Sequence, residues 1–307
     1  MRGPFSSRTR SSRLSTVVTV RMQCGLGNQM FQYALGRALA QRHRTSLAMD
    51  VSSYRHDKRR EYCLGVFKIR VKFGDYPSLD WPRSLGQRLR LPGFAFDLGR
   101  VRIPGYTYVL KERSFAFDPT VLDSPDNVYL DGFWQSEKYF VGIEEIIRKE
   151  FAMEGTNPNV QELARRIRAT ESVCVNVRRR DYVSIPSTAA FLGFVGTAYY
   201  AEGMKLIQAR VRCPSLFVFS DEIEWCIANL RFENSTTYVG HEYAGEKFQN
   251  YLYLMSLCKH FIIPNSTFAW WGAWLSNTRG TIVAPKGWFC APEMDASDIV
   301  PNGWFRL

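Results

Sequence analysis

The chain has 307 residues, of which 46% are hydrophobic and 22% are charged, a composition that excludes a disordered chain and predicts two globular domains. The 40 Lys and Arg against 29 Asp and Glu give a net charge of +11, so we expect an acidic partner such as a phosphorylated substrate, an anionic membrane or nucleic acid. No stretch is as long and apolar as the roughly 18 residues that a membrane span requires.

The first elements predict a βαβ unit behind a basic tail. Residues 1–14 are rich in Ser and Arg and contain no apolar segment of the kind found in secretion signals, so we expect a disordered tail there. The β-branched residues 15–22 predict a strand, and the glycine loop at 24–29 opens a helix that ends near His43. Residues 47–50 predict the next strand.

Segment 52–126 has no clear periodicity, because basic stretches alternate with Pro and Gly. We expect short helices and loops there. A strand at 128–130 and a helix at about 142–151 complete an N-terminal α/β domain of residues 15–155. The basic residues of the irregular segment include Lys58, Arg59, Arg60, Arg83, Arg88 and Arg90.

The second half of the chain alternates strands and helices, which predicts a doubly wound parallel sheet in a C-terminal α/β domain of residues 156–307. In its last helix, Trp270, Trp271 and Trp274 are expected to face the core rather than to form a stacking platform. The predicted strands are 172–177, 216–219, 237–239, 260–263 and 281–284, and the predicted helices are about 197–211, 222–230, 245–258 and 267–275.

Polar residues follow three of these strands. Residues 178–181, with the sequence Arg-Arg-Arg-Asp, follow the first strand, Asp221 follows the second, and residues 265–267 follow the fourth. Right-handed crossovers place all three groups at the edge of the sheet where α/β proteins bind ligands. Arg178 or Arg179 is suited to hold a phosphate there, because a guanidinium binds phosphate through two parallel hydrogen bonds.

The residues beside these arginines complete a predicted nucleotide diphosphate site. Ser266 and Thr267 are expected to cap a helix whose N–H groups face an anion. Asp221 accepts hydrogen bonds only, which suits ribose hydroxyls or the donor edge of a guanine. A solvated basic turn at 178–181 and ordinary helix caps at Asp221 and Ser266 are the alternatives.

The glycine loop near the N-terminus does not match a dinucleotide fingerprint. Gly25 and Gly27 have the first spacing of that pattern, but Met30 stands at its last glycine, so a nicotinamide cofactor is not expected. Asn28 and Gln29 at the helix start are instead predicted to present amides to a sugar or phosphate across a cleft. Two α/β units that face each other in this way suit glycosyl transfer.

Cysteine and histidine usage predicts no metal and no disulfide framework. The seven cysteines are scattered without a Cys-x-x-Cys pair, and the four histidines are dispersed. We therefore expect a reducing, cytoplasmic setting. No nucleic-acid motif accompanies the positive charge, so we expect no nucleic-acid partner, and peripheral contact with the anionic inner face of a membrane is the better use of that charge.

Four ordered motifs resemble those of the α-1,2-fucosyltransferases of glycosyltransferase family 11, and the resemblance runs from Met22 to about Trp288. The motifs are GLGNQMFQY at 25–33, GFWQSEKYF at 132–140, RR-x-DY at 178–182 and NSTFAWWGAWL at 265–275.

This resemblance implies a GT-B fold of two Rossmann-type domains facing a cleft, with residues 15–155 on the acceptor side and residues 156–307 on the donor side. It also implies metal-independent, inverting transfer of L-fucose from GDP-L-fucose to a galactose hydroxyl of a glycan in α-1,2 linkage, without a cofactor. Arg178 would then bind the β-phosphate and Asn28 would reach across the cleft, both as catalytic groups. The donor-binding residues would be Gly25, Gly27, Gln29, Asn176, Arg179, Asp181, Asp221, Asn265, Ser266 and Thr267.

The sequence departs from the family pattern at several positions. Asn176 stands where a His is usual, Tyr251 where an acidic residue is common, and Arg180 and Ala269 replace a Gly and a Ser. A different sugar nucleotide or acceptor, or a nucleotide- or glycan-binding protein with weakened catalysis, is therefore the alternative. The general base is not assigned, with Asp50, Asp131 and Glu137 as candidates.

Overall fold

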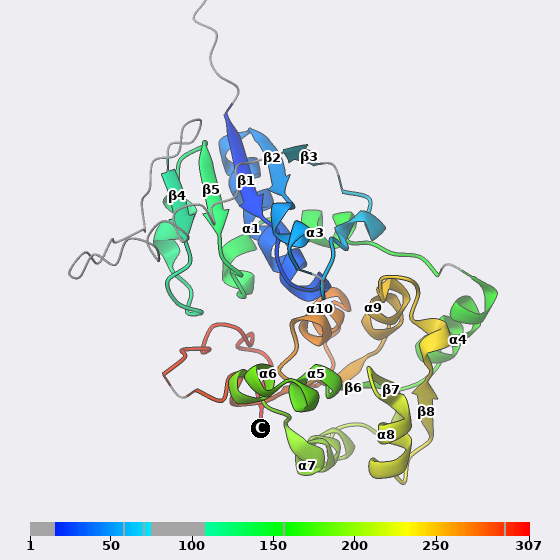
Figure 1. The fold of residues 1–307 in the computed structure, drawn as a ribbon. Coiled ribbons are helices and arrows are strands. Elements are labelled where there is room, and N and C mark those ends of the chain that lie inside the picture. Colours follow the sequence, from blue (N-terminus) through cyan, green and yellow to red (C-terminus); the bar gives the residue numbers. More distant parts are fainter. Residues whose placement is uncertain (1–15, 58, 70, 75–107, 156, 292) are drawn as a thin grey trace, which may run out of the picture.

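The computed structural model describes residues 16–57, 59–69, 71–74, 108–155, 157–291 and 293–307. Within these ranges the chain forms two β-sheets, each flanked by helices, which meet through helices near the centre of the molecule (Figure 1). The predicted tail, 1–14, and Lys58, Arg83, Arg88 and Arg90 lie outside the described residues.

The first sheet has the strand order β3-β2-β1-β5-β4, and its described pairs are all parallel. Val18 and Val20 of the central strand are fully buried, as expected for a parallel strand covered on both faces. Helix α1 (Leu26–His43) connects β1 to β2 and packs on both. The strands are β1 (Val17–Arg21), β2 (Ser46–Asp50), β3 (Lys72–Gly74), β4 (Tyr108–Lys111) and β5 (Val128–Asp131).

The second sheet has the order β11-β10-β9-β6-β7-β8, and its described pairs are also parallel. The chain builds outward from β6 to β8 and then returns to the other side of β6 with β9. This reversal between β6 and β9 opens a crevice at their C-terminal ends, where ligands of such sheets bind. The strands are β6 (Ser172–Val177), β7 (Ser215–Ser220), β8 (Thr236–Val239), β9 (His260–Ile262), β10 (Ile282–Ala284) and β11 (Phe305–Arg306).

The remaining helices largely follow the predicted pattern in the second half. The α-helices are α3 (Glu144–Glu150), α4 (Pro158–Arg168), α5 (Arg180–Ser184), α6 (Pro186–Phe191), α7 (Gly196–Gln208), α8 (Ile223–Asn229), α9 (Gln249–Ser256) and α10 (Thr267–Leu275). The 3-10 helices are η1 (Ser52–Arg55), η2 (Leu64–Val66), η4 (Pro119–Asp123), η5 (Glu137–Phe140) and η6 (His241–Tyr243).

The structure contains several elements that were not predicted from the sequence, namely helices α4, α5 and α6 and strands β3, β4 and β11. Residues 157–159, interpreted as a domain boundary, begin α4: the side chain of Asn157 accepts from the Val160 N–H at 3.0 Å, and Pro158 occupies the first turn. An Asn cap followed by Pro is a helix start, because this proline has no N–H to leave unpaired. The boundary at residue 155 itself stays a prediction.

The two sheets are joined through an aromatic interface, defined here as Phe31, Phe140, Phe151, Trp270, Trp271 and Trp274. The ring of Phe31 from α1 lies 4.5 Å from Trp270 and 4.9 Å from Trp271 of α10. The Trp271 indole also donates to the Gly27 carbonyl at 3.0 Å. One continuous cluster of buried apolar side chains therefore runs through both domains, and the tryptophans are core residues as predicted.

Gly27 allows this close approach. A Cβ at this position would lie 2.4 Å from the Phe268 nitrogen and 2.5 Å from the Thr267 carbonyl carbon. The start of α1 therefore touches the start of α10, and the helix N-termini from the two domains meet beside the crevice. The fold is the predicted GT-B-like arrangement of two Rossmann-type domains.

Candidate active site

A cavity of about 640 Å³ lies between the two domains. Its first wall comes from the loop after β1 and from residues 59–63, and its second wall comes from the C-terminal ends of β6, β7 and β9. Ten of the twelve predicted site residues line it: Gly25, Gly27, Asn28, Asn176, Arg178, Asp181, Asp221, Asn265, Ser266 and Thr267.

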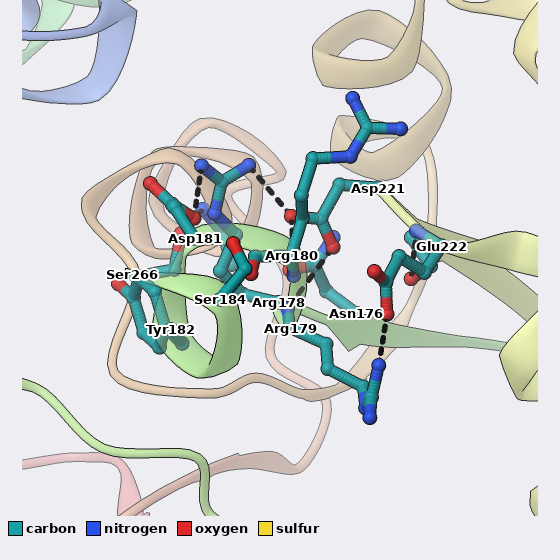
Figure 2. A network of polar contacts seen from close by, with 12 residues as sticks. Asn176, Arg178, Arg179, Arg180, Asp181, Tyr182, Ser184, Asp221, Glu222 and Ser266 are labelled. Atoms are coloured by element: carbon teal, nitrogen blue, oxygen red, sulfur yellow. Dashed lines mark hydrogen bonds and ion pairs between the residues drawn. The ribbon is translucent and has the colours of Figure 1, made fainter. Parts of the chain in front are cut away.

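Arg178 is held in the cavity wall by two carboxylates. Its guanidinium lies 2.7 Å from an oxygen of Asp181 and 3.1 Å from an oxygen of Asp221, and the side chain remains 29% exposed (Figure 2). Burial lowers the pKa of Arg178, but the two carboxylates outweigh this and raise it above its ordinary value. The result is a permanent cation in a fixed orientation, which suits a phosphate group.

Asp221 has contacts within the protein that were not predicted from the sequence. Its carboxylate accepts from the backbone N–H groups of Arg179, at 3.0 Å, and Arg180, at 3.2 Å, in addition to the Arg178 ion pair. Both oxygens therefore have partners within the protein. Asp221 fixes the turn after β6 and orients Arg178, and because it also lines the cavity, the ligand contact predicted for it stays a prediction.

Arg179 also differs from its predicted donor contact. It pairs with Glu222 (Figure 2). Its guanidinium lies 4.7 Å from the ring centre of Trp225, and it does not line the cavity. Consecutive residues at the end of a strand point in different directions, so one of the two arginines faces the cavity and the other packs beside α8. Of the two arginines that the sequence offered as phosphate-binding residues, Arg178 is the one that faces the cavity.

The start of α10 forms the neighbouring part of the wall. The Ser266 hydroxyl caps the helix by accepting from the Ala269 N–H at 3.5 Å. The Asn265 amide donates to the carbonyls of Leu192, at 2.7 Å, and Trp288, at 3.0 Å, while its buried oxygen has no hydrogen-bond partner among the described residues. The positive end of the helix dipole thus lies at the cavity near Arg178, and both features attract an anion.

On the opposite wall, only part of the glycine loop is available to a ligand. The Asn28 oxygen accepts from the Gln135 amide at 2.8 Å, so Asn28 offers a ligand its N–H donors. Gln29 is fully buried: its amide donates to the carbonyls of Cys24 and Glu61, both at 2.8 Å, and its oxygen accepts from the Cys63 N–H. The donor contact predicted for Gln29 does not fit this position, because the side chain ties the loop to residues 61–63.

Two of the four positions that depart from the family pattern, Asn176 and Tyr251, line the cavity. The Asn176 amide lies 3.4 Å from the Phe219 carbonyl, a long hydrogen bond in the buried end of the site. The Tyr251 hydroxyl donates to the Val239 carbonyl at 2.7 Å, and burial raises its pKa. Tyr251 is therefore a neutral group that presents its ring to the cavity.

The three candidate bases do not line the cavity. The buried Asp50 accepts from the Ser52 N–H and from the Tyr129 hydroxyl, Asp131 pairs with Arg21, and Glu137 accepts from the Trp274 indole. Each carboxylate also has a structural partner, so the structure singles out none of the three as the base. Within the described ranges, no three His, Cys, Asp or Glu side chains are grouped to hold a metal ion, and no helix is long and apolar enough to cross a membrane.

Sequence reasoning missed Glu112, which supports the wall that carries Gln135. Its carboxylate accepts from the backbone N–H groups of Phe133, at 2.6 Å, and Trp134, at 2.8 Å. It thereby holds a turn in which Trp134 has a φ of 58°, an uncommon value for a bulky residue. No pattern marks Glu112 in the sequence, because it lies inside the aperiodic segment 52–126.

Glu112 is expected to make stability fall as pH rises. Burial raises the pKa of its carboxyl to about 7, although two backbone N–H groups oppose the shift. Because this value lies above that of the unfolded chain, its stabilising contribution is complete below the unfolded pKa and is lost as pH rises through about 7. Urea unfolding between about pH 5 and pH 8 should show a loss on the order of 1–3 kcal/mol that Glu112→Gln lacks. Equal pH dependence in the two proteins would contradict this assignment.

A fixed cation and a helix N-terminus at the edge of one parallel α/β domain, facing a second such domain, define a GT-B-type glycosyltransferase. Residues 98–307 match the model of Glycosyl transferase family 11, and the chain belongs to this family, as the four motifs predicted. It is 32% identical over 302 residues to the alpha-1,2-colitosyltransferase of Escherichia coli, covering 95% of this chain and 99% of that protein. It is 29% identical to the O-antigen biosynthesis glycosyltransferase WbnK of Escherichia coli, covering 92% and 98%.

Among solved structures, the chain resembles the NodZ alpha-1,6-fucosyltransferase co-crystallized with GDP. That likeness has a TM-score of 0.48 and 16% identity and covers 84% of this chain and 91% of the other.

Proposed function

We propose that this glycosyltransferase transfers L-fucose, or its relative colitose, from the GDP-linked sugar to a galactose hydroxyl of a glycan, forming an α-1,2 linkage. The observation that carries the proposal is Arg178, fixed in the cavity by Asp181 and Asp221 beside the start of α10. The family motifs and the name of the full-length relative alpha-1,2-colitosyltransferase support the sugar class and the linkage.

The proposed reaction is a single displacement with inversion at the anomeric carbon. The acceptor hydroxyl forms a bond to that carbon and releases its proton to solvent, while the bond from the carbon to the β-phosphate oxygen breaks. Negative charge then grows on the departing GDP. Arg178 and the α10 N-terminus face this charge and stabilise it more in the transition state than in the bound donor, which accelerates the step.

Two donors are retained because two observations favour them. The motif set resembles that of α-1,2-fucosyltransferases, whereas a relative that spans nearly the whole chain is named a colitosyltransferase. In addition, Tyr251 replaces the acidic residue that is common in the family, and its hydroxyl donates to the Val239 carbonyl, so this part of the cavity wall differs from the family pattern. The change at this position is compatible with a donor preference other than fucose.

The test is a donor panel with galactose-terminated acceptors. GDP-L-fucose and GDP-colitose should each be assayed for GDP release, with a UDP-sugar as the negative control, and the product linkage determined by NMR. We expect release of GDP from at least one GDP-sugar and an α-1,2 linkage in the product. Turnover with the UDP-sugar alone, or GDP binding without transfer to any acceptor, would refute the proposal.

A further inference from the structure

Arg60 reaches from the N-terminal domain toward the Arg178 site. It lies in the segment between η1 and η2, lines the cavity and is 42% exposed. One of its guanidinium nitrogens lies 2.8 Å from an oxygen of Asp181 in the opposite domain. A Cβ on Gly25, just before the start of α1, would lie 3.8 Å from the other terminal nitrogen of Arg60. Arg60 is therefore placed between the two walls.

Asp181 is shared by two arginines. One of its oxygens is 2.7 Å from Arg178 and the other is 2.8 Å from Arg60. Burial raises the pKa of the Asp181 carboxyl, but the two guanidinium groups outweigh this and hold it below its ordinary value. Two like charges are thus held close together by one carboxylate, an arrangement that an added anion would stabilise further.

The charges at this point are balanced before any ligand is added. Arg60 and Arg178 face Asp181 and Asp221, and the starts of α1 and α10 add partial positive charge. A nucleoside diphosphate brings at least two negative charges on two phosphate groups. Arg60 on one wall and Arg178 on the other match these two phosphate groups better than Arg178 alone.

We propose that Arg60 binds the diphosphate of the sugar nucleotide from the N-terminal domain, opposite Arg178. The diphosphate lies between the two guanidinium groups, and Asp181 holds both of them in position before the donor arrives. This inference rests on the proposed function and adds a second positive group to the leaving-group site. Arg60 then contributes both to donor affinity and to the stabilisation of the departing nucleotide.

A neighbouring ion pair allows diphosphate binding by Arg60 to be distinguished from a purely structural role, in which Arg60 only bridges the two domains. Glu61, the next residue, pairs with Lys247 of the C-terminal domain and also lines the cavity. Both pairs bridge the domains, but in the second one the N-terminal domain contributes the anion. If bridging were the whole role of Arg60, then Glu61→Gln and Arg60→Ala would have the same effect.

The experiment is calorimetric titration of GDP and GMP into the full-length protein and its variants. Arg60→Ala should weaken GDP binding by about tenfold or more, the size of a lost charge-assisted contact, and change GMP binding by less than about threefold. Arg60→Lys should recover part of the loss. Glu61→Gln should leave the ratio of GDP to GMP affinity unchanged, and Arg178→Ala serves as the positive control.

Three outcomes would overturn the inference in distinguishable ways. Wild-type affinity for GDP in Arg60→Ala, combined with a loss in Arg178→Ala, would remove Arg60 from the site and leave the proposed function intact. Equal losses of GDP and GMP binding in Arg60→Ala and Glu61→Gln would show that Arg60 only bridges the two domains. Absence of GDP binding in the wild-type protein would refute the proposed function as well. Melting temperatures of the variants will show that each one folds.

Discussion

Replacing Arg178 with alanine is expected to lower kcat/KM for sugar transfer by on the order of 10²–10³, the usual cost of removing one group that stabilises developing charge. The loss should appear in kcat as well as in donor KM, because the charge on the departing phosphate is larger in the transition state than in the bound donor. GDP release measured over a range of donor concentrations separates the two parameters. Arg178→Lys keeps the charge but loses the planar guanidinium, so its kcat/KM should lie between the values of the wild type and Arg178→Ala.

Arg179→Ala is the matched control, since it removes the same charge one residue away. Arg179 pairs with Glu222 and packs near Trp225 outside the cavity, so transfer activity should stay within about threefold of the wild-type value. The assignment would fail if Arg178→Ala retained activity within about tenfold of wild type, or if both variants lost activity equally.

Replacing Gly27 with alanine is expected to destabilise the protein by about 1–3 kcal/mol or more, the usual cost of overpacking. The new methyl group would lie 2.4 Å from the Phe268 nitrogen and 2.5 Å from the Thr267 carbonyl carbon. These are backbone atoms at the start of a helix and cannot rotate away, so α1 and α10 must separate. Urea unfolding gives the change in free energy, and GDP binding should weaken with it because both helix starts line the cavity.

Gly25→Ala provides the comparison at the other end of the same loop. A methyl group there would meet only the Arg60 guanidinium at 3.8 Å, and the backbone φ of −83° suits any residue. Its stability should therefore stay within about 0.5 kcal/mol of wild type, as for ordinary surface changes. Equal destabilisation by the two substitutions would show that the close approach of the helices is not what Gly27 provides.

The sequence predicted the second sheet and the grouping of polar residues at its edge because these depend on local patterns. The buried run of β6, Ser172–Val177, and the helix α10, Thr267–Leu275, have the predicted bounds. One is an apolar, β-branched run and the other begins with its own capping serine, so neighbouring residues are sufficient to define them. The C-terminal ends of parallel strands then share one edge by chirality alone.

The sequence did not predict the partners of individual side chains, because these depend on tertiary geometry. Asp221 satisfies backbone N–H groups from the turn after the neighbouring strand β6, and Gln29 binds a loop more than thirty residues away. Neither contact leaves a periodic pattern. Arg60 and Glu112 were missed for the same reason, since each comes from the aperiodic stretch between the first helix and the GFWQSEKYF motif.

The apolar block that α1 and α10 share has a consequence for how substrates enter and leave. Burying a whole tryptophan removes about 150–250 Å² from water, worth about 4–6 kcal/mol, and rotating the two halves apart would expose the part of the Trp270 and Trp271 rings that packs on Phe31. A wide opening would therefore lose part of this stabilisation. We expect sugar nucleotide and spent nucleotide to exchange instead through the mouth of a standing crevice, by breaking short polar bridges such as Arg60 to Asp181 while the tryptophans stay in place.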